Sequence, residues 1–307
     1  MFAYIVKRVL GMIPILLLVS ILSFFLIRLT PSDPIRIIYG NDLDKATYEK
    51  YRQLEGFDDP LIVQYGRYMV KVVTEFDFGT SYRTKSQVTE QISERAISTL
   101  ILTFAAMAWA IVIGLLVGIV SATKRNSIWD RLGMVTTITA LSVPEFWFGL
   151  VLMQLFSVYL GWLPSAGAGT WQHLIMPSLT LGLGVAAVIA RFTRASVLEV
   201  LREDYVRTAR AKGQKESVII GTHVLRNALI PVVTMAGLQF GFLIGGAAVV
   251  ESVFAYPGLG ALLIDSISSR DYPVVQALIL LFSVQFLIVN LLVDISYGLL
   301  NPQIRYE

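Results

Sequence analysis

The chain has 307 residues, of which 55% are hydrophobic and only 15% are charged, and its formal net charge is +3. Because a soluble domain of this composition could not cover its apolar side chains with polar ones, the sequence predicts an integral membrane protein. The small net charge gives no reason to expect nucleic acid as a partner, and the absence of cysteine excludes disulfides, thiolate metal sites and a cysteine nucleophile.

Six apolar intervals are predicted to cross the membrane, which takes roughly 20 residues each. The first, Val9–Leu29, is longer than the core of a cleaved signal peptide, about 7 to 15 residues, so we interpret it as a retained helix. The others are bounded by charges: one between Arg95 and Lys124, two between Arg131 and Arg191 that the turn-rich GWLPSAGAGTWQH divides, one between Arg226 and Glu251, and one between Asp271 and Asp294. The expected fold is an all-α membrane protein.

Lysine and arginine in the short connections predict the orientation of the helices, because cytoplasmic loops are enriched in them. Lys7 and Arg8 precede the first helix, and Lys124 and Arg125 follow the second. Both termini are therefore expected in the cytoplasm. The opposite side receives the long segment 31–95, in which TYEKYRQLEGFDDPLIVQYGRYMVKVV predicts two short amphipathic helices with a break at Gly-Phe-Asp-Asp-Pro.

The most charged cytoplasmic connection is 191–226, which holds eight basic and four acidic residues. Apolar residues recur in it at steps of three and four over Val197–Lys212, which predicts one amphipathic helix. Gly213 follows at the position of a helix C-terminal glycine, and a second helical run begins at Glu216. The segment is thus predicted to be a helix, a glycine turn and another helix at the membrane surface.

Two functions are compatible with this segment. A solvated basic loop would only set the topology, and charge alone does not exclude that. The apolar stripe over Val197–Lys212 favours a docking element, because such an element needs an apolar face for the groove of a partner and a charged rim to orient it.

Several motifs resemble one family: EDYVRTARAKG at Glu203–Gly213, LRNALIPVV at Leu225–Val233, RLTPSDP, DFGTSYRTKSQV, VFAYPGLGALLIDSISSRDYPVVQ and NPQIRY. They resemble the permeases of ABC importers, in the branch for dipeptides, oligopeptides, nickel and glutathione, and are most similar to dipeptide- and glutathione-type permeases. The general loop pattern has Glu-Ala-Ala where this chain has Arg207, Thr208 and Ala209, a change usual for this branch. The resemblance implies the type I ABC importer permease fold.

The resemblance also implies partners. In such importers a short coupling helix seats in a cleft of an ATPase subunit, and closure of two ATPases turns paired permeases from inward- to outward-facing. We therefore expect a second homologous permease subunit, two cytoplasmic ATPase subunits and an extracytoplasmic substrate-binding protein, around a chain embedded in the lipid of a bacterial inner membrane. ATP and Mg would bind to the partner subunits. This chain is expected to hold no cofactor and not to be an enzyme, since it lacks a G-x-x-x-x-G-K-[ST] phosphate loop.

On this basis the chain divides into three parts. Residues 1–94 form the first helix and the extracytoplasmic loop, 95–296 form the permease core with the coupling loop 191–226, and 297–307 form a cytoplasmic tail. The residues that match the coupling motif, and are expected to dock the ATPase, are Glu203, Tyr205, Arg207, Ala209, Arg210, Lys212 and Gly213.

Two further sites are predicted, each with an alternative. Glu145 follows a proline near the middle of the third span, where a carboxylate is costly and suggests the translocation pathway, with a substrate ammonium as its partner. The alternative is a protonated or hydrogen-bonded carboxyl beside a proline kink. Tyr256 and Gly258, in the turn YPGLG, are candidates for contact with the binding protein or for a plain interfacial turn. No metal site is expected, because His173 and His223 lie on opposite predicted sides.

The predicted function is a permease subunit that forms half of the pathway for di- or oligopeptides or glutathione. Import of nickel or a metal chelate by the same architecture is an alternative. An ion-coupled secondary transporter would predict several midplane carboxylates or broken helices in paired halves, and the sequence has only one such carboxylate and no internal repeat. A membrane enzyme would require a convergent nucleophile, base or metal cluster, and neither histidine has a neighbour for that role.

Overall fold

The computed structural model describes residues 2–29, 33–40, 42–54 and 56–300, and in these ranges the chain is helical without a strand. The α-helices are α1 Phe2–Leu29, α2 Pro34–Tyr39, α3 Lys45–Leu54, α4 Leu61–Glu75, α5 Val88–Thr123, α6 Ile128–Ser142, α7 Glu145–Leu152, α8 Gln172–Val200, α9 Asp204–Ala211, α10 Glu216–Val218, α11 Leu225–Val253, α12 Leu259–Ser268 and α13 Tyr272–Leu300. There are also two π-helical segments. The first, η1 Met153–Tyr159, directly follows α7, and the second, η2 Ile219–Val224, directly precedes α11.

Five helical stretches in these ranges are long and apolar enough to cross a membrane, namely α1, α5, α8, α10 to α11, and α13. They confirm the all-α membrane fold and five of the six predicted spans. The third predicted span is not one continuous helix, because α6 and the α7–η1 segment meet at 105°. Pro144 lies at this break. Since proline lacks an N–H and disfavours helical backbone in the residue before it, Val143 is extended, with φ −85° and ψ 125°.

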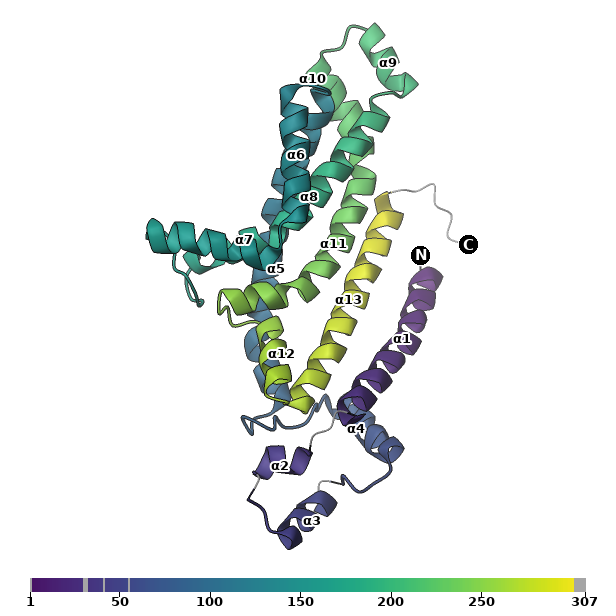
Figure 1. Cartoon of the computed structure of the whole chain (residues 1–307). Helices are drawn as coiled ribbons and strands as arrows, with labels where there is room; N and C mark the ends of the chain where they lie inside the picture. The colour runs from purple at the N-terminus through teal and green to yellow at the C-terminus, as the bar shows by residue number, and fades with distance from the viewer. Residues whose placement is uncertain (1, 30–32, 41, 55, 301–307) are drawn as a thin grey trace.

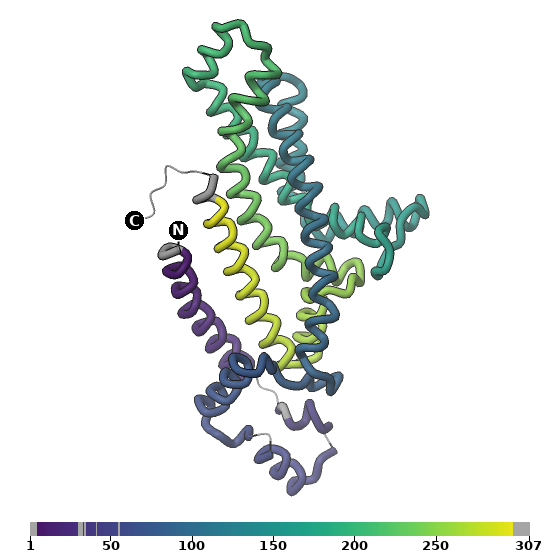
Figure 2. The backbone as a smooth tube through the Cα atoms, turned by 180° about the vertical axis from the view of Figure 1, so that it is seen from behind, coloured from purple at the N-terminus to yellow at the C-terminus, as the bar shows by residue number. Residues whose placement is uncertain are grey.

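The long helices run side by side and separate two groups of short helices (Figure 1). α9 and α10, from the charged segment, lie at one end of the molecule, and α2, α3 and α4 lie at the other. Figure 2 shows the same separation from behind. The two predicted amphipathic helices are confirmed as α3 and α4. Arg8 of α1 pairs with Asp294 of α13 at 3.0 Å, so the beginning of α1 and the last turns of α13 lie on the same side of the molecule.

α5 and α8 form the most extensive helix pair. Gly114 of α5 lies so close to α8 that an added Cβ would come within 2.8 Å of the Ile189 side chain, and at Gly118 it would come within 2.6 Å of Thr193. Small residues thus allow the two backbones to approach closely, as is common between membrane helices. Because α8 leads into the charged segment, this contact fixes where that segment begins.

Two boundaries of the three predicted parts of the chain do not coincide with the ends of helices. The division after residue 94 falls inside α5, which begins at Val88, because charges such as Arg95 end an apolar span without ending a helix. Residues 297–300 of the predicted tail continue α13, and 301–307, with the motif NPQIRY, lie outside the described residues.

Candidate functional site

The segment between α8 and α11 contains two short helices that follow separate turns. A turn at 201–203 ends α8, and the carbonyl oxygen of Glu203 then accepts hydrogen bonds from the N–H groups of Val206 and Arg207 at 3.1 and 3.2 Å. These bonds start α9 as a new helix (Figure 1). The prediction of one helix over Val197–Lys212 is therefore wrong, because apolar residues keep helical spacing across a turn.

Gly213 makes the second turn, as predicted. Its φ of +75° is a left-handed conformation that glycine adopts without the steric cost of a side chain. The guanidinium of Arg210 donates to both carboxylate oxygens of Glu216, at 2.6 and 3.1 Å, and so joins α9 to α10 across the turn. These hydrogen bonds raise the pKa of Arg210, which stays cationic.

Two side-chain contacts hold the segment against neighbouring helices. The amide nitrogen of Asn227, in α11, donates to the hydroxyl of Tyr205, in α9, at 2.8 Å. The Nε2 atom of His223 lies 3.1 Å from the amide oxygen of Gln214, next to the glycine turn. Tyr205 and Arg210, both predicted docking residues, therefore have partners within the chain that hold the shape of the segment.

The apolar side chains of the segment pack into the core of the chain itself. Val206 and Ala209 of α9 are buried in one cluster with Val197, Ile219 and Val224, and only 6% of Ala209 is exposed. Part of the predicted apolar stripe is therefore used inside the chain, whereas Tyr205, which belongs to the same stripe, is 42% exposed, and docking through it stays a prediction. The exposed surface of α9 that a partner could meet consists of Tyr205 and polar side chains.

The exposed side of α9 carries charge. Glu203, Arg207 and Lys212 are exposed, and Arg207 forms an ion pair at 3.5 Å with the equally exposed Asp204. Such an exposed pair contributes little to stability, so these charges are free to meet a partner. The structure thus divides the predicted docking residues into charges that face solvent and residues that hold the fold.

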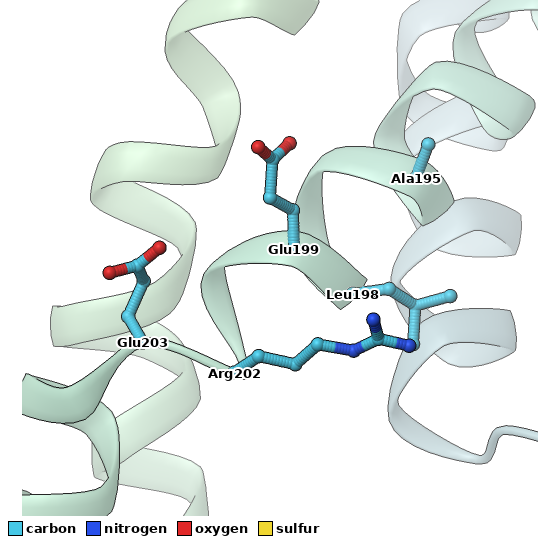
Figure 3. A pocket seen from close by; sticks show the side chains of 5 residues that line it. All are labelled: Ala195, Leu198, Glu199, Arg202 and Glu203. Carbon is cyan, nitrogen blue, oxygen red and sulfur yellow. The ribbon is translucent and has the colours of Figure 1, made fainter.

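A recess of about 440 Å³ adjoins the start of α9. It is lined by Ala195, Leu198, Glu199, Arg202 and Glu203. Figure 3 shows the carboxylates of Glu199 and Glu203 on one side of the recess and the guanidinium of Arg202 extending away from them. This edge of the segment presents both signs of charge.

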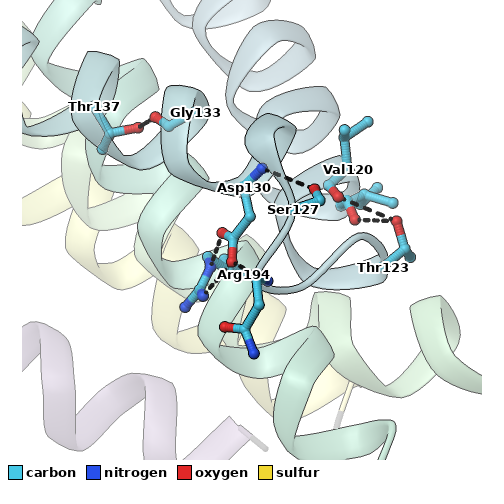
Figure 4. Close-up of polar contacts among 9 residues, drawn as sticks. Val120, Thr123, Ser127, Asp130, Gly133, Thr137 and Arg194 are labelled. Carbon is cyan, nitrogen blue, oxygen red and sulfur yellow. Dashed lines mark hydrogen bonds and ion pairs between the residues drawn. The ribbon is translucent and has the colours of Figure 1, made fainter.

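A further ion pair, which sequence reasoning missed, lies beside the segment. Asp130, in the first turn of α6, accepts hydrogen bonds from Arg194 of α8 at 2.7 and 2.9 Å, and the aspartate side chain is only 6% exposed (Figure 4). Asp130 also accepts a hydrogen bond from the N–H of Asn126 at 3.0 Å. The signal in the sequence is the helix-capping serine Ser127, which accepts a weak hydrogen bond from the N–H of Asp130. Nothing local indicates a partner 64 residues away.

Glu145 is the first residue of α7 and does not lie in the middle of a straight helix. It is exposed, and within the described part of the chain no hydrogen bond or ion pair is found for it. One carboxylate oxygen lies 3.9 Å from the position that a Cβ on Gly184 of α8 would take. The predicted proline kink is confirmed. The predicted hydrogen bond to the carboxyl of Glu145 is not found in the described part of the chain. A negative charge in the first turn is favoured by the helix dipole.

The turn YPGLG joins α11 to α12 around a buried carboxylate. Glu251 accepts hydrogen bonds from the Thr99 hydroxyl at 2.7 Å and from the N–H of Ala261 at 2.9 Å. Tyr256 is 6% exposed and Gly258 is buried, while Ala255 and Pro257 are exposed. The contact with a binding protein stays a prediction. Because Tyr256 and Gly258 are buried, the exposed residues of the turn, Ala255 and Pro257, are the better candidates for it.

Residues 110–306 match the family model described as binding-protein-dependent transport system inner membrane component, and residues 1–103 match the N-terminal model of such a membrane component. The chain belongs to this family. The glutathione transport system permease protein GsiC of Pectobacterium atrosepticum is 54% identical to the permease described here, and that of Escherichia coli K12 is 52% identical. Both alignments cover 307 residues and the full length of each chain.

This permease also shares its fold with solved ABC transporters. A chain of the MetNI methionine ABC transporter in an inward-facing conformation has a TM-score of 0.58 at 21% identity, over 69% of this permease and 97% of that chain. A chain of an amino acid ABC transporter solved with histidines has a TM-score of 0.53 at 16% identity, over 70% and 95% of the two chains. These likenesses show the fold alone.

Family membership decides between the predicted classes of function. The permease is a membrane-embedded transport component of an ABC importer, not a catalytic subunit and not an ion-coupled secondary transporter. Such a component works with an ATPase and with a binding protein, so partners of both kinds are implied.

Proposed function

We propose that this permease forms one half of an ATP-driven pathway for glutathione or a similar short peptide. The observation that carries the proposal is 52–54% identity, without a gap in coverage, to permeases of glutathione transport systems. Among the described residues no group of three or more His, Cys, Asp or Glu side chains could hold a metal ion. Import of nickel or a metal chelate by the same architecture is the competing proposal, and nickel is included in the assay below.

The proposed assembly contains a second homologous permease, two ATPase subunits that bind ATP and Mg, and an extracytoplasmic binding protein, with the loop 191–226 on the ATPase side. The residues proposed to contact the ATPase are the exposed Glu203, Arg207 and Lys212. Tyr205, Arg210 and Gly213 hold the loop in shape for that contact. Ala209 supports it from the core.

Glu145 is proposed to face the translocation pathway. Three observations support this role. Glu145 is exposed, it has no partner within the described chain, and it lies beside Gly184. A carboxylate in the membrane that has no partner within its own chain requires water, substrate or a second subunit to offset its desolvation.

The test is uptake by the four kinds of subunit reconstituted in vesicles, with radiolabelled glutathione, a dipeptide or nickel outside and ATP inside. We expect ATP-dependent accumulation of glutathione. In the same assay Glu145→Gln should raise KM more than it lowers the maximal rate. Transport of nickel alone would contradict the glutathione proposal.

The coupling residues are tested by the double substitution Arg207→Glu with Lys212→Glu. It should reduce ATP-driven uptake by at least tenfold and weaken co-purification of the ATPase, because two charges that face the partner are reversed. Arg125→Glu, which reverses an exposed charge in the α5–α6 turn, is the matched control. Equal uptake in the double variant and the control would show that this face of α9 does not couple.

A further inference from the structure

A second cavity lies at the end of the molecule opposite α9, and the proposed coupling does not involve it. Its volume is about 1040 Å³, near the upper end of the roughly 300–1,000 Å³ typical of small-molecule sites. Its walls come from the end of α1, from α2 to α4, from the loop 77–85 and from the first turns of α13. These elements gather at the lower end of Figure 1.

The lining of this cavity is cationic, with five basic side chains against two carboxylates. Arg52 and Arg67 are neutralised outside the lining, by Asp58 and Asp59, at 2.6 Å in each pair. Of the two carboxylates in the lining, Asp33 pairs at 3.4 Å with Arg36, which lies outside the lining, so three cations and the carboxylate of Asp77 determine the net positive charge that a bound molecule would meet.

Those cations are Arg28, Lys71 and Lys85, and none of them forms an ion pair within the described part of the chain. The guanidinium of Arg28 donates to the amide oxygen of Gln64, and Lys85 donates to the carbonyl of Ile38 at 2.6 Å. Both bonds leave the positive charge without a counter-charge. An anion in the cavity would supply one.

The cavity also contains hydrogen-bonding groups that have no partner among the residues that the structure describes. The side chain of Gln276, on α13, is only 6% exposed, and its amide nitrogen has no hydrogen-bond acceptor. The hydroxyl of Tyr68, on α4, is likewise buried and unpartnered. Burial raises the pKa of Tyr68, so the phenol keeps its proton and can donate. Because buried polar groups are nearly always hydrogen-bonded, two such groups in one cavity require an explanation.

We propose that this cavity binds a small organic anion, which Arg28 and Lys71 attract through its oxyanion groups and to which Gln276 and Tyr68 donate hydrogen bonds. The cations favour a ligand of negative charge. The unpartnered donors favour a ligand that also has acceptor oxygens. A short peptide has this chemistry in its carboxylates and amides, and the headgroup of an anionic lipid has it in its phosphate and esters. Both share the oxyanion, and the experiment separates the two sources.

The experiment uses the assembled transporter in phosphatidylcholine nanodiscs, without the binding protein, and measures equilibrium binding of tritiated glutathione. Gln276→Leu and Tyr68→Phe should each raise Kd by at least fivefold. Each change removes a group that has no partner in the free protein, so folding should be preserved. Gln285→Leu is the matched control, because its amide oxygen is also buried and unpartnered on α13 but does not line the cavity.

Charge is tested separately with Lys71→Gln, which should raise Kd by about threefold at low salt, with a smaller effect at high salt because the interaction is screened. Lys50→Gln, an exposed lysine of α3 outside the lining, should leave Kd unchanged. The second arm adds phosphatidylglycerol to the nanodiscs and measures how much of this lipid co-purifies with each variant.

Either source supports the proposal. Glutathione binding that depends on Gln276 and Tyr68 identifies a free anion, and phosphatidylglycerol retention that depends on them identifies a lipid headgroup. If neither probe binds, or if both bind equally to the wild type and the two variants, the proposal is overturned. Uptake of glutathione through the pathway is scored in the separate vesicle assay, so failure of one proposal does not decide the other.

Discussion

Gly258 shows how one missing methyl group allows two helices to meet. A Cβ at this position would overlap the carboxylate of Glu251, which binds Thr99 and the first turn of α12. Gly258→Ala must therefore displace a buried carboxylate from its donors, and we expect it to lower the free energy of unfolding by about 1–3 kcal/mol. The measurement is the thermal unfolding midpoint of the purified permease.

Two comparisons make this prediction specific. Gly245→Ala, in the same helix as Glu251 but with no atom within 4 Å of the new Cβ, should leave the midpoint unchanged or raise it slightly. In a Glu251→Ala background, Gly258→Ala should cost much less, since the obstacle is gone. An equal cost in both backgrounds would mean that the carboxylate is not what the glycine accommodates.

The ion pair between α6 and α8 joins two elements next to the coupling loop. Asp130→Asn keeps the shape of the side chain but leaves Arg194 without its counter-charge, and because Arg194 is 26% exposed to water we expect a loss of about 1.5–3 kcal/mol, less than for a fully buried pair. Asp204→Asn breaks the exposed pair with Arg207 and should change stability by no more than about 0.5 kcal/mol. Unfolding in a denaturant series measures both. Similar losses in the two variants would show that burial does not distinguish these pairs.

The ends of helices in this permease could be predicted where a residue typical of a helix end marks them in the sequence. The turn at Gly213 follows from a glycine at a helix end with basic residues before it, and the structure has the expected positive φ there. The turn at 201–203 was missed, because its residues interrupt no apolar pattern. The burial of part of the stripe, at Val197 and Ala209, was missed as well. Spacing shows that Val197 and Ala209 share a character, but not whether they face a partner or the core.

At the scale of the whole molecule, the two proposed sites lie at opposite ends of the same long helices. The family and the membrane fold could be predicted from the sequence because motifs and apolar spans extend along the chain. The cavity could not, since Gln276 and Tyr68 belong to helices that meet only in three dimensions. The charge pattern nevertheless predicts which end faces the cytoplasm, and this is the basis of the last prediction.

The chain contains no cysteine, so a single introduced cysteine reports on one position alone. Lys212→Cys lies in the basic loop and Lys50→Cys in α3, and both positions are exposed. Because loops rich in lysine and arginine stay in the cytoplasm, a membrane-impermeant maleimide should label Lys50→Cys in intact spheroplasts and Lys212→Cys only after the membrane is opened. The unsubstituted chain, which cannot react, is the control. The reverse labelling pattern would show that the molecule has the opposite orientation in the membrane. The loop 191–226 would then lie outside the cytoplasm, where no cytoplasmic ATPase could contact it.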